Sequence, residues 1–498
     1  MVDVGWVTEV DWGNDGTYVG TGEDVSADVQ RVSLRRGRDN ELGRIIPGEC
    51  EITIKNDTGT YSPDNTGSPI TGLILPGRKV RLRSVSPVAK THFLGYLEDI
   101  IPEPTPGEQI ATIRAVDGAA QVLATKTVRT PMFASKGAGS AVGDVLDRVG
   151  WSGTDRLIDT GQTTFGQWFV QDESALDALH KIEEAERGLF LVRGDGYAIY
   201  EDRHHRLKGA HLTSQATFTA TMIGMNYQSR LREIKNEAVV KVYVPFAGTS
   251  GTELWRLRDY PFLPPNTRSI LVIGESSPTT ATAIYYAEYD DPATSIVTPV
   301  SGTDFTFNSQ ADGLGTDLTS QLTVAFVTSF AKGGAISVTN AGPFGGYLTL
   351  LKVRGTPQSR EEPLTIASGD ATSQTTYGKR SITIDNDLVQ SSNDAQDYAD
   401  YLVSILKDGK AYIQIDLANL SAQMTSDLLT LDISDRITIV EGNTGVNGDY
   451  SIEQKELEIE GSDVKCSLLC SKVPTATGTY LILDDATYGL LNTGILGF

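Results

Sequence analysis

The chain has 498 residues, of which 64 are Asp or Glu and 42 are Lys or Arg, so its formal net charge is −22. This length exceeds what one hydrophobic core covers, and we expect several domains. The acidic excess argues against a protein that holds nucleic acid by summed positive charge. The three cysteines exclude a disulfide framework and fit folding in a reducing compartment.

The N-terminal sequence MVDVGWVTEVDWGND lacks the basic start and apolar segment of a secretory signal. No run approaches the ~20 apolar residues that a membrane-spanning helix needs. We therefore expect a protein without a membrane span that is made in the cytoplasm.

Residues 1–128 consist of short alternating runs such as ECEITIKN, KVRLRSV and HFLGYLEDI, separated by Gly, Pro, Asn and Asp. This pattern is typical of antiparallel strands joined by turns. We predict an all-β barrel or a small sandwich for this region.

A helical spacing of apolar residues begins near residue 137 and is clearest in DESALDALHKIEEAERG. Asp172 is a candidate N-cap of this second helix, and Gly188 lies where a C-cap glycine belongs. The next segment, LFLVRGDGYAIYEDR, indicates two strands around a GDG turn. Residues 129–211 therefore form a predicted small α/β domain.

Strand patterns return after residue 212 and are interrupted by a stretch that is poor in charge and rich in Thr, Ser, Gly and Val. This stretch predicts a β-sandwich inserted into a longer β unit. A strand, a helix and further strands follow, and Ser391 with Asp394 offers a capping box for that helix. The fold class is thus mainly β and multidomain, with two β-barrel domains, a small α/β domain and an inserted β-sandwich. The predicted boundaries are 1–128, 129–211, 212–263 with 378–472 for the second barrel, 264–377 for the insertion, and 473–498 for a C-terminal arm.

Arg35, Arg36 and Arg38 form a basic cluster in the acidic chain. On a strand, Arg36 and Arg38 share one face and Arg35 lies on the other. Guanidinium groups pair well with carboxylates, which favours a contact to another protein subunit; an ordinary solvated strand edge and a phosphate contact are the alternatives. We take these three residues as a candidate protein interface.

Two patterns suggest metal sites but lack the required ligands. In DWGNDGTYVGTGE, a calcium loop starting at Asp11 would need a carboxylate at Gly22, and Glu23 comes one position late. A turn between strands is the simpler interpretation. His204 and His205 have only Glu201 and Asp202 nearby, so exposed loop histidines are expected.

Catalytic patterns are also incomplete. Asp484 and Asp485 could serve as an acid and a base, but they lie on the predicted arm without a pocket. Cys466 and Cys470 lack the spacing of a metal site and are expected as buried small apolar residues. No serine hydrolase, zinc protease or cysteine–histidine pattern occurs. We expect neither an enzyme nor a cofactor.

The order of these segments resembles that of minor tail proteins, or tail hub proteins, of long-tailed bacteriophages. The resemblance rests on SADVQRVSLRRGRDNELGRIIPGECEITIKNDTGTYSPDN, SALDALHKIEEAERGLFLVRGDGYAIYEDR, GGYLTLLKVRGTPQ, YGKRSITIDNDLVQSSNDAQDYADYLVS and LDDATYGLLNTGILGF, which run in the expected order across nearly the whole chain. It implies a structural hub, usually a trimer, at the tip of the virion's tail. In such hubs the two barrels of each subunit resemble each other and the tube subunit, so three copies present six barrels to a six-fold tube.

The resemblance further implies contacts to the tail tube or distal tail protein, to the tape measure protein and to tail fibres or spikes, with DNA passing through without specific binding. An acidic channel would repel DNA phosphates during ejection. One alternative is a carbohydrate-binding adhesin, in which the inserted sandwich with TATAIYYAEYD exposes tyrosines. A second alternative is a tail-associated wall hydrolase.

Overall fold

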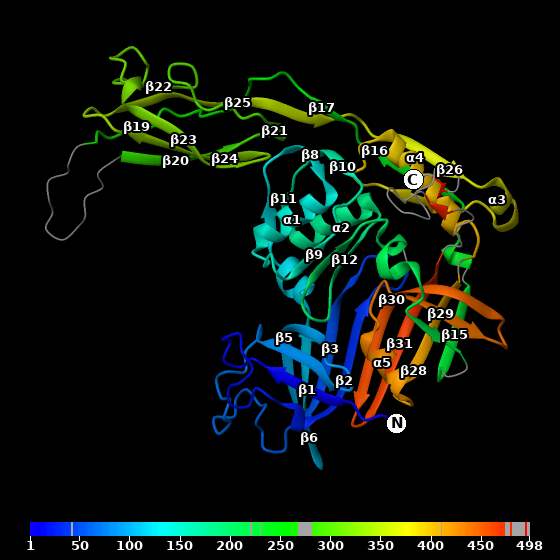
Figure 1. Ribbon diagram of the computed structural model, residues 1–498. Coiled ribbons are helices and arrows are strands. Elements are labelled where there is room, and N and C mark those ends of the chain that lie inside the picture. Colours follow the sequence, from blue (N-terminus) through cyan, green and yellow to red (C-terminus); the bar gives the residue numbers. More distant parts are fainter. Residues whose placement is uncertain are drawn as a thin grey trace.

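The computed structural model describes residues 1–40, 43–219, 222–229, 231–266, 281–409, 411–473, 479–480 and 494–495. Most of the predicted C-terminal arm, including Asp484 and Asp485, lies outside these residues. The described chain is mainly β and has several sheets, which confirms the predicted fold class. Figure 1 shows a large sheet that carries a mixed α/β part, from which an elongated β arm extends.

The large sheet has 12 strands. One face of the sheet and helix α5 (Ala422–Thr430) enclose a single apolar core that includes Ile52, Ile113, Leu428 and Leu457. This follows from the alternation of apolar and polar residues along each strand. Ten strands follow one another in the order β1 (Gly5–Val10), β4 (Lys79–Ser86), β5 (Lys90–Thr105), β6 (Glu108–Val116), β3 (Ile46–Lys55), β2 (Val29–Gly37), β30 (Val446–Glu460), β31 (Asp463–Lys472), β28 (Ala411–Ala418) and β15 (Gly224–Ser229), while β29 (Arg436–Glu441) pairs with β30 and β14 (Ala216–Phe218) with β29.

The two predicted barrels are therefore halves of one sheet. We call β1 to β6 the first module, and β14, β15 and β28 to β31 with α5 the second module. They meet where β2 pairs antiparallel with β30, from Arg31 opposite Glu460 to Gly37 opposite Gln454. We call this pairing the joint.

The two modules have the same topology. Across the sheet, the first module runs β2-β3-β6-β5-β4-β1 and the second runs β15-β28-β31-β30-β29-β14. Along the chain, the strands of each module also occur in matching order. The modules differ at their last pair, since β1 is antiparallel to β4 whereas β14 is parallel to β29.

The long hairpins of the two modules match in detail. Both β5–β6 and β30–β31 turn through two residues, after Thr105 and Glu460. Each hairpin has one β-bulge the same number of residues before its turn, immediately before Asp99 and Gln454. The two hairpins thus correspond residue by residue, which the sequence does not reveal.

The mixed α/β part combines residues 127–201 with segments that were predicted to belong to the second barrel and, for residues 364–377, to the inserted sandwich. Both groups share one apolar core, because helix α4 (Ser392–Leu406) covers β16 and β26 and contributes Ala395 and Leu402 to it. The prediction that 237–242 and 381–406 belong to the barrel was wrong. The elements are β7 (Thr127–Arg129), β8 (Phe133–Gly137), α1 (Ala138–Val149), β9 (Arg156–Ile158), β10 (Thr164–Trp168), β11 (Gln171–Ser174), α2 (Ala175–Glu186), β12 (Leu189–Val192), β13 (Ala198–Glu201), β16 (Glu237–Val242), β26 (Leu364–Gly369), α3 (Ala371–Tyr377), β27 (Ser381–Ile384) and α4.

Helix caps follow local sequence with one correction. The Ser391 hydroxyl accepts from the backbone N–H of Asp394 at 3.3 Å, as predicted for α4. Helix α2 is capped by Ser174, not by Asp172, and Arg187 rather than Gly188 adopts the left-handed conformation at its end. The Ser174 hydroxyl accepts a hydrogen bond from the Asp177 backbone N–H at 3.1 Å. Asp172 lies two residues earlier and does not cap the helix.

The elongated arm consists of two sheets around one core, as the predicted sandwich implies, but it begins at β17, before residue 264. Its core includes Phe305, Phe307, Ile336 and Leu348. One sheet has the order β20 (Ala281–Glu288), β24 (Gly333–Asn340), β23 (Leu322–Phe330), and the other surrounds β25 (Gly346–Arg360) with β17 (Pro245–Ala247), β18 (Thr252–Arg256), β19 (Phe262–Leu263), β21 (Ala293–Thr294) and β22 (Phe305–Asn308). Outside these parts, β32 (Thr479–Tyr480) pairs with β33 (Gly494–Ile495).

Candidate assembly interface

The joint is a continuous strand ladder with an apolar side and a polar side. Val32 and Leu34 of β2 are 1% and 2% exposed, and they lie opposite Ile459 and Leu457 of β30. Cross-strand apolar pairs of this kind stabilise a sheet and exclude water from its hydrogen bonds. The joint therefore holds the two modules in one fixed orientation.

Two of the three predicted interface arginines are buried at the joint, Arg36 within the strand pairing and Arg38 one residue beyond it. Arg38 donates from Nε to Glu453 Oε2 at 2.7 Å, and the two side chains are 8% and 0% exposed. Arg206 also binds Glu453, with Nη1 at 2.5 Å from Oε1 and Nη2 at 3.0 Å from Oε2. The Ser471 hydroxyl adds a 2.7 Å hydrogen bond. All four residues of this cluster belong to the same chain.

Arg36 binds a second buried carboxylate, with Nη2 at 2.9 Å from Asp432 Oδ1 and a side chain that is 4% exposed. Lys90 approaches the other oxygen of Asp432 at 3.4 Å. Lys455, on β30, donates to the Leu431 carbonyl at 2.6 Å. These contacts tie β2 to the segment that connects α5 with β29.

The buried charges titrate far from their ordinary ranges. Burial alone would raise the pKa of Glu453, but the charges of Arg206 and Arg38 outweigh burial and hold the pKa well below its ordinary value. Burial would likewise raise the pKa of Asp432, and Arg36 and the neighbouring lysines hold it low. Burial lowers the pKa of Lys455 to about 8. Both carboxylates thus stay ionised at neutral pH.

The predicted pairing of the arginines with carboxylates is therefore found, but for Arg36 and Arg38 it occurs between two modules of one chain. These two residues are buried and are not available to another subunit. Arg35 lies on the opposite face, as the alternation predicted, and is about half exposed. It binds Glu456 at 3.1 Å and Asp39 at 2.8 Å, and it alone remains a candidate for an outside contact.

Gly37 lets the two modules approach closely. Its φ is +119°, and a Cβ at this position would overlap the carbonyl oxygen of Glu453. Only glycine fits such a conformation and such a backbone approach without strain. Beyond it, the Arg38 backbone N–H donates to the Glu453 carbonyl at 2.9 Å.

The face of the large sheet opposite the core carries charged side chains across both modules. Arg31 of β2 and Glu458 of β30, for example, pair at 3.3 Å across the joint. Acidic residues outnumber basic ones on this face. The acidic residues are Glu9, Glu49, Glu51, Asp99, Glu103, Glu108, Asp416, Asp449, Glu456, Glu458, Glu460 and Asp463, and the basic ones are Arg31, Arg35, Lys55, Lys79, Arg81, Arg83, Arg114, Arg436 and Lys465.

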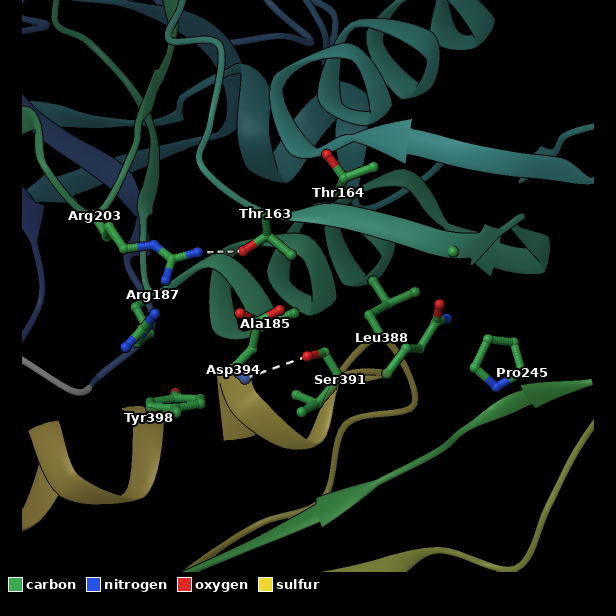
Figure 2. A pocket seen from close by; sticks show the side chains of 13 residues that line it. Thr163, Thr164, Ala185, Arg187, Arg203, Pro245, Leu388, Ser391, Asp394 and Tyr398 are labelled. Carbon is green, nitrogen blue, oxygen red and sulfur yellow. Dashed lines mark hydrogen bonds between the residues drawn. The ribbon is translucent and has the colours of Figure 1, made fainter. Parts of the chain in front are cut away.

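A cavity of about 210 Å³ lies between α2, β10 and the start of α4. Figure 2 shows Arg187, Arg203 and Tyr398 around it. Arg203 is bound to Glu186 at 3.2 Å and to the Thr163 hydroxyl, and Arg187 lies over the Tyr398 ring at 5.2 Å. Arg203 is thus ion-paired and Arg187 is stacked on an aromatic ring, so we assign this cavity to packing between the helices.

The remaining sequence patterns lie in structural roles. Asp11 accepts from the backbone N–H groups of Asp15 and Gly16, which closes a turn as expected. His205 is partly buried rather than exposed, because its Nδ1 lies 2.7 Å from Asp159. The three cysteines are free and buried. In the part of the chain that the structure describes, no three His, Cys, Asp or Glu residues form a metal site, and no helix is long and apolar enough to span a membrane.

Sequence reasoning missed Glu453, Asp432 and Arg206, the buried partners at the joint. One signal was available in SIEQKELEIEG, where Lys455 falls on the same face as Leu457 and Ile459. A cation on the apolar face of a strand indicates buried charged partners. Nothing local identifies Arg206, which comes from a short helical turn at His205–Leu207.

No protein-family model matches the chain, and no curated protein matches its sequence. Among the solved structures that match it, two tail proteins cover nearly all of the chain with TM-scores of 0.50 and 0.51. The 43 kDa tail protein of prophage MuSo2 from Shewanella oneidensis has a TM-score of 0.50 and 10% identity, over 94% of this chain and 98% of that chain. The tail protein from Neisseria meningitidis MC58 has a TM-score of 0.51 and 9% identity, over 94% and 97%. The chain therefore has the fold of these tail proteins over nearly its whole length.

Proposed function

We propose that the chain is a structural, non-enzymatic hub protein of a bacteriophage tail tip. Copies of it form a ring, three to a hub, that closes the tail tube. The ring receives the tail tube or distal tail protein on one side and the spike or fibre proteins on the other, and it surrounds the end of the tape measure protein and the path of the DNA. The virion is its site of action.

The observation that carries this proposal is the duplicated module. Two units with one strand order, one chain order and one bulge position stand edge to edge in a single sheet. A chain that already repeats a unit sideways supplies two neighbouring units of a ring, provided that the rotation from one unit to the next closes after a whole number of steps. Three copies supply six similar modules, which matches a six-fold tube.

The charge of the open sheet face fits a DNA channel. If this face lines the ring, its excess of carboxylates repels DNA phosphates and keeps the duplex from adhering during ejection. Arg31, Arg35 and Arg114 are paired with glutamates on the same face, so they offer little free positive charge.

Tail particles that carry an affinity tag in the elongated arm test this proposal. The tag, labelled with a gold-conjugated antibody, should appear at the end of the tail away from the head in electron micrographs. Label along the shaft, on the head or only on free protein would contradict the proposal.

A second candidate function, carbohydrate binding by the elongated arm, is favoured by one feature. Tyr286 is 76% exposed at a cavity of about 340 Å³ that also includes the ion pair of Arg129 and Asp172. Exposed aromatic rings beside polar groups bind sugar rings. A glycan array with the full chain should give a signal that Tyr286→Ala abolishes. No signal from either protein would exclude this function, and equal signals would exclude Tyr286 as the binding residue.

A further inference from the structure

Two edges of the large sheet have no strand partner among the described residues. β15 pairs only with β28, and residues 99–105 of β5 pair only with β6. In Figure 1 these strands lie on opposite sides of the sheet. An open edge presents backbone N–H and C=O groups that can bind another strand.

Within the chain, the counterparts of these two edges bind each other. The pairing registers align 31–36 of β2 with 224–229 of β15, and 453–460 of β30 with 98–105 of β5. The alignment extends to backbone bonds beside the edges. Leu97 exchanges two hydrogen bonds of 2.7 Å with residues 77 and 78, and Ile452 exchanges bonds of 2.9 Å and 3.0 Å with residues 434 and 435.

We infer that β15 of one copy adds to the 99–105 edge of β5 in a second copy, antiparallel and in the register of β2 on β30. This register places Met225 opposite Pro104, Asn226 opposite Glu103 and Tyr227 opposite Pro102. The inference rests on the proposed ring and names the surface through which the copies join. The two edges differ, so each copy uses both of them and the contact repeats from copy to copy.

Exposure of apolar side chains along β15 supports this partner. Val32 and Leu34 of β2 are 1% and 2% exposed because β30 lies beside them. Met225 of β15 is the counterpart of Val32 and is only partly buried. Tyr227 is the counterpart of Leu34 and is 49% exposed. Ile223 and Leu231 beside this edge are 48% and 54% exposed. A second copy would cover these groups as β30 covers β2.

The two prolines make the contact between copies weaker than the joint. By the alternation of an antiparallel strand, Pro102 and Pro104 present their nitrogen atoms to the open edge, where Leu457 and Ile459 of β30 have N–H groups. β15 can donate to the proline carbonyls, but the prolines cannot donate in return. The edge thus accepts one specific strand and resists indiscriminate pairing.

Charges at the end of the edge also match. Glu98 is exposed and is the counterpart of the buried Glu453. Arg232 lies within one residue of the position that corresponds to Arg38, and it is 70% exposed, next to Glu233 at 3.0 Å. In the inferred register, Arg232 of one copy approaches Glu98 of the next, as Arg38 approaches Glu453.

Disulfide cross-linking of the full chain tests the register. Asn226 and Glu103 would form a non-hydrogen-bonded pair with Cα atoms about 4.5 Å apart, which suits a disulfide. Asn226→Cys with Glu103→Cys should therefore link copies under mild oxidation. The matched control, Asn226→Cys with Thr105→Cys, is two residues out of register on the same face. The native cysteines are buried and stay in both variants.

We expect at least a tenfold higher yield of linked chains for the first variant. Adding Pro102→Leu with Pro104→Ile, which copies the residues of β30, should raise that yield further. Absence of links, or equal yields from the control, would overturn the inference. A closed oligomer seen by native mass spectrometry without links would leave the ring standing and refute the register. A ladder of cross-linked oligomers of increasing size, without a closed oligomer, would support the register and refute the closed hub.

Discussion

Replacing Arg38 by alanine tests whether the buried charges hold the joint together. The substitution leaves Glu453, which is 0% exposed, with Arg206 and Ser471 but without its 2.7 Å partner directly after β2. Breaking a buried ion pair costs about 3–5 kcal/mol, and we expect about 3 kcal/mol because two partners remain. Since 1.36 kcal/mol is a factor of ten, opening of the joint should become about a hundredfold more frequent.

Hydrogen exchange of the backbone amides of 454–460 measures this opening, and the amides of β20 to β24 in the elongated arm serve as an internal reference. The matched control is Arg31→Ala, which removes an ion pair between the same two strands whose side chains are 55% and 50% exposed. That pair should contribute less than about 1 kcal/mol, hence less than about a fivefold change. Equal effects of the two substitutions, or a change below fivefold for Arg38→Ala, would refute the role of the buried pair.

Three further outcomes are expected. The folded protein holds the pKa of Glu453 below its ordinary value of 4.5, so the ionised carboxylate stabilises the folded state above pH 4.5. This stabilisation is lost as the pH falls below that value, and urea unfolding between pH 5 and about pH 3 should show the loss. Glu453→Gln should reduce the pH dependence. Gly37→Ala should open the joint at least tenfold more often in hydrogen exchange, whereas Gly107→Ala, which has positive φ but no neighbour within 4 Å, should leave the joint amides unchanged. In the Asn226→Cys with Glu103→Cys variant, Glu98→Arg should lower the yield of linked chains about tenfold, and adding Arg232→Glu should restore it. If the yield is not restored, the proposed contact between Arg232 and Glu98 is refuted.

Local patterns predicted the strands of the large sheet well. Alternation in ECEITIKN predicted the strand β3. The same rule predicted that Arg35 and Arg36 lie on opposite faces of their strand, as they do in the structure. Ser391 was found as a cap because its partner is three residues away. Signals of this kind depend on neighbours in the sequence, and the physical cause acts over the same short range.

The joint was not predictable by such rules. Arg38 binds Glu453, which is 415 positions away, and the pairing of β2 with β30 has no local signature. The strand pattern of 237–242 was assigned to the barrel because a strand's alternation does not reveal which sheet it joins. For the same reason the sequence predicted carboxylate partners of Arg36 and Arg38 in another subunit, whereas the structure has carboxylate partners for both within the chain.

The number and arrangement of modules around the axis of the assembled hub is the most direct measurement of the central claim. A cryo-electron microscopy map of the tail tip should show three-fold symmetry with six similar modules, alternately joined by β2 on β30 and by β15 on β5, with the acidic sheet face toward the channel. A different number of modules, or a ring in which this face points outward, would contradict the account.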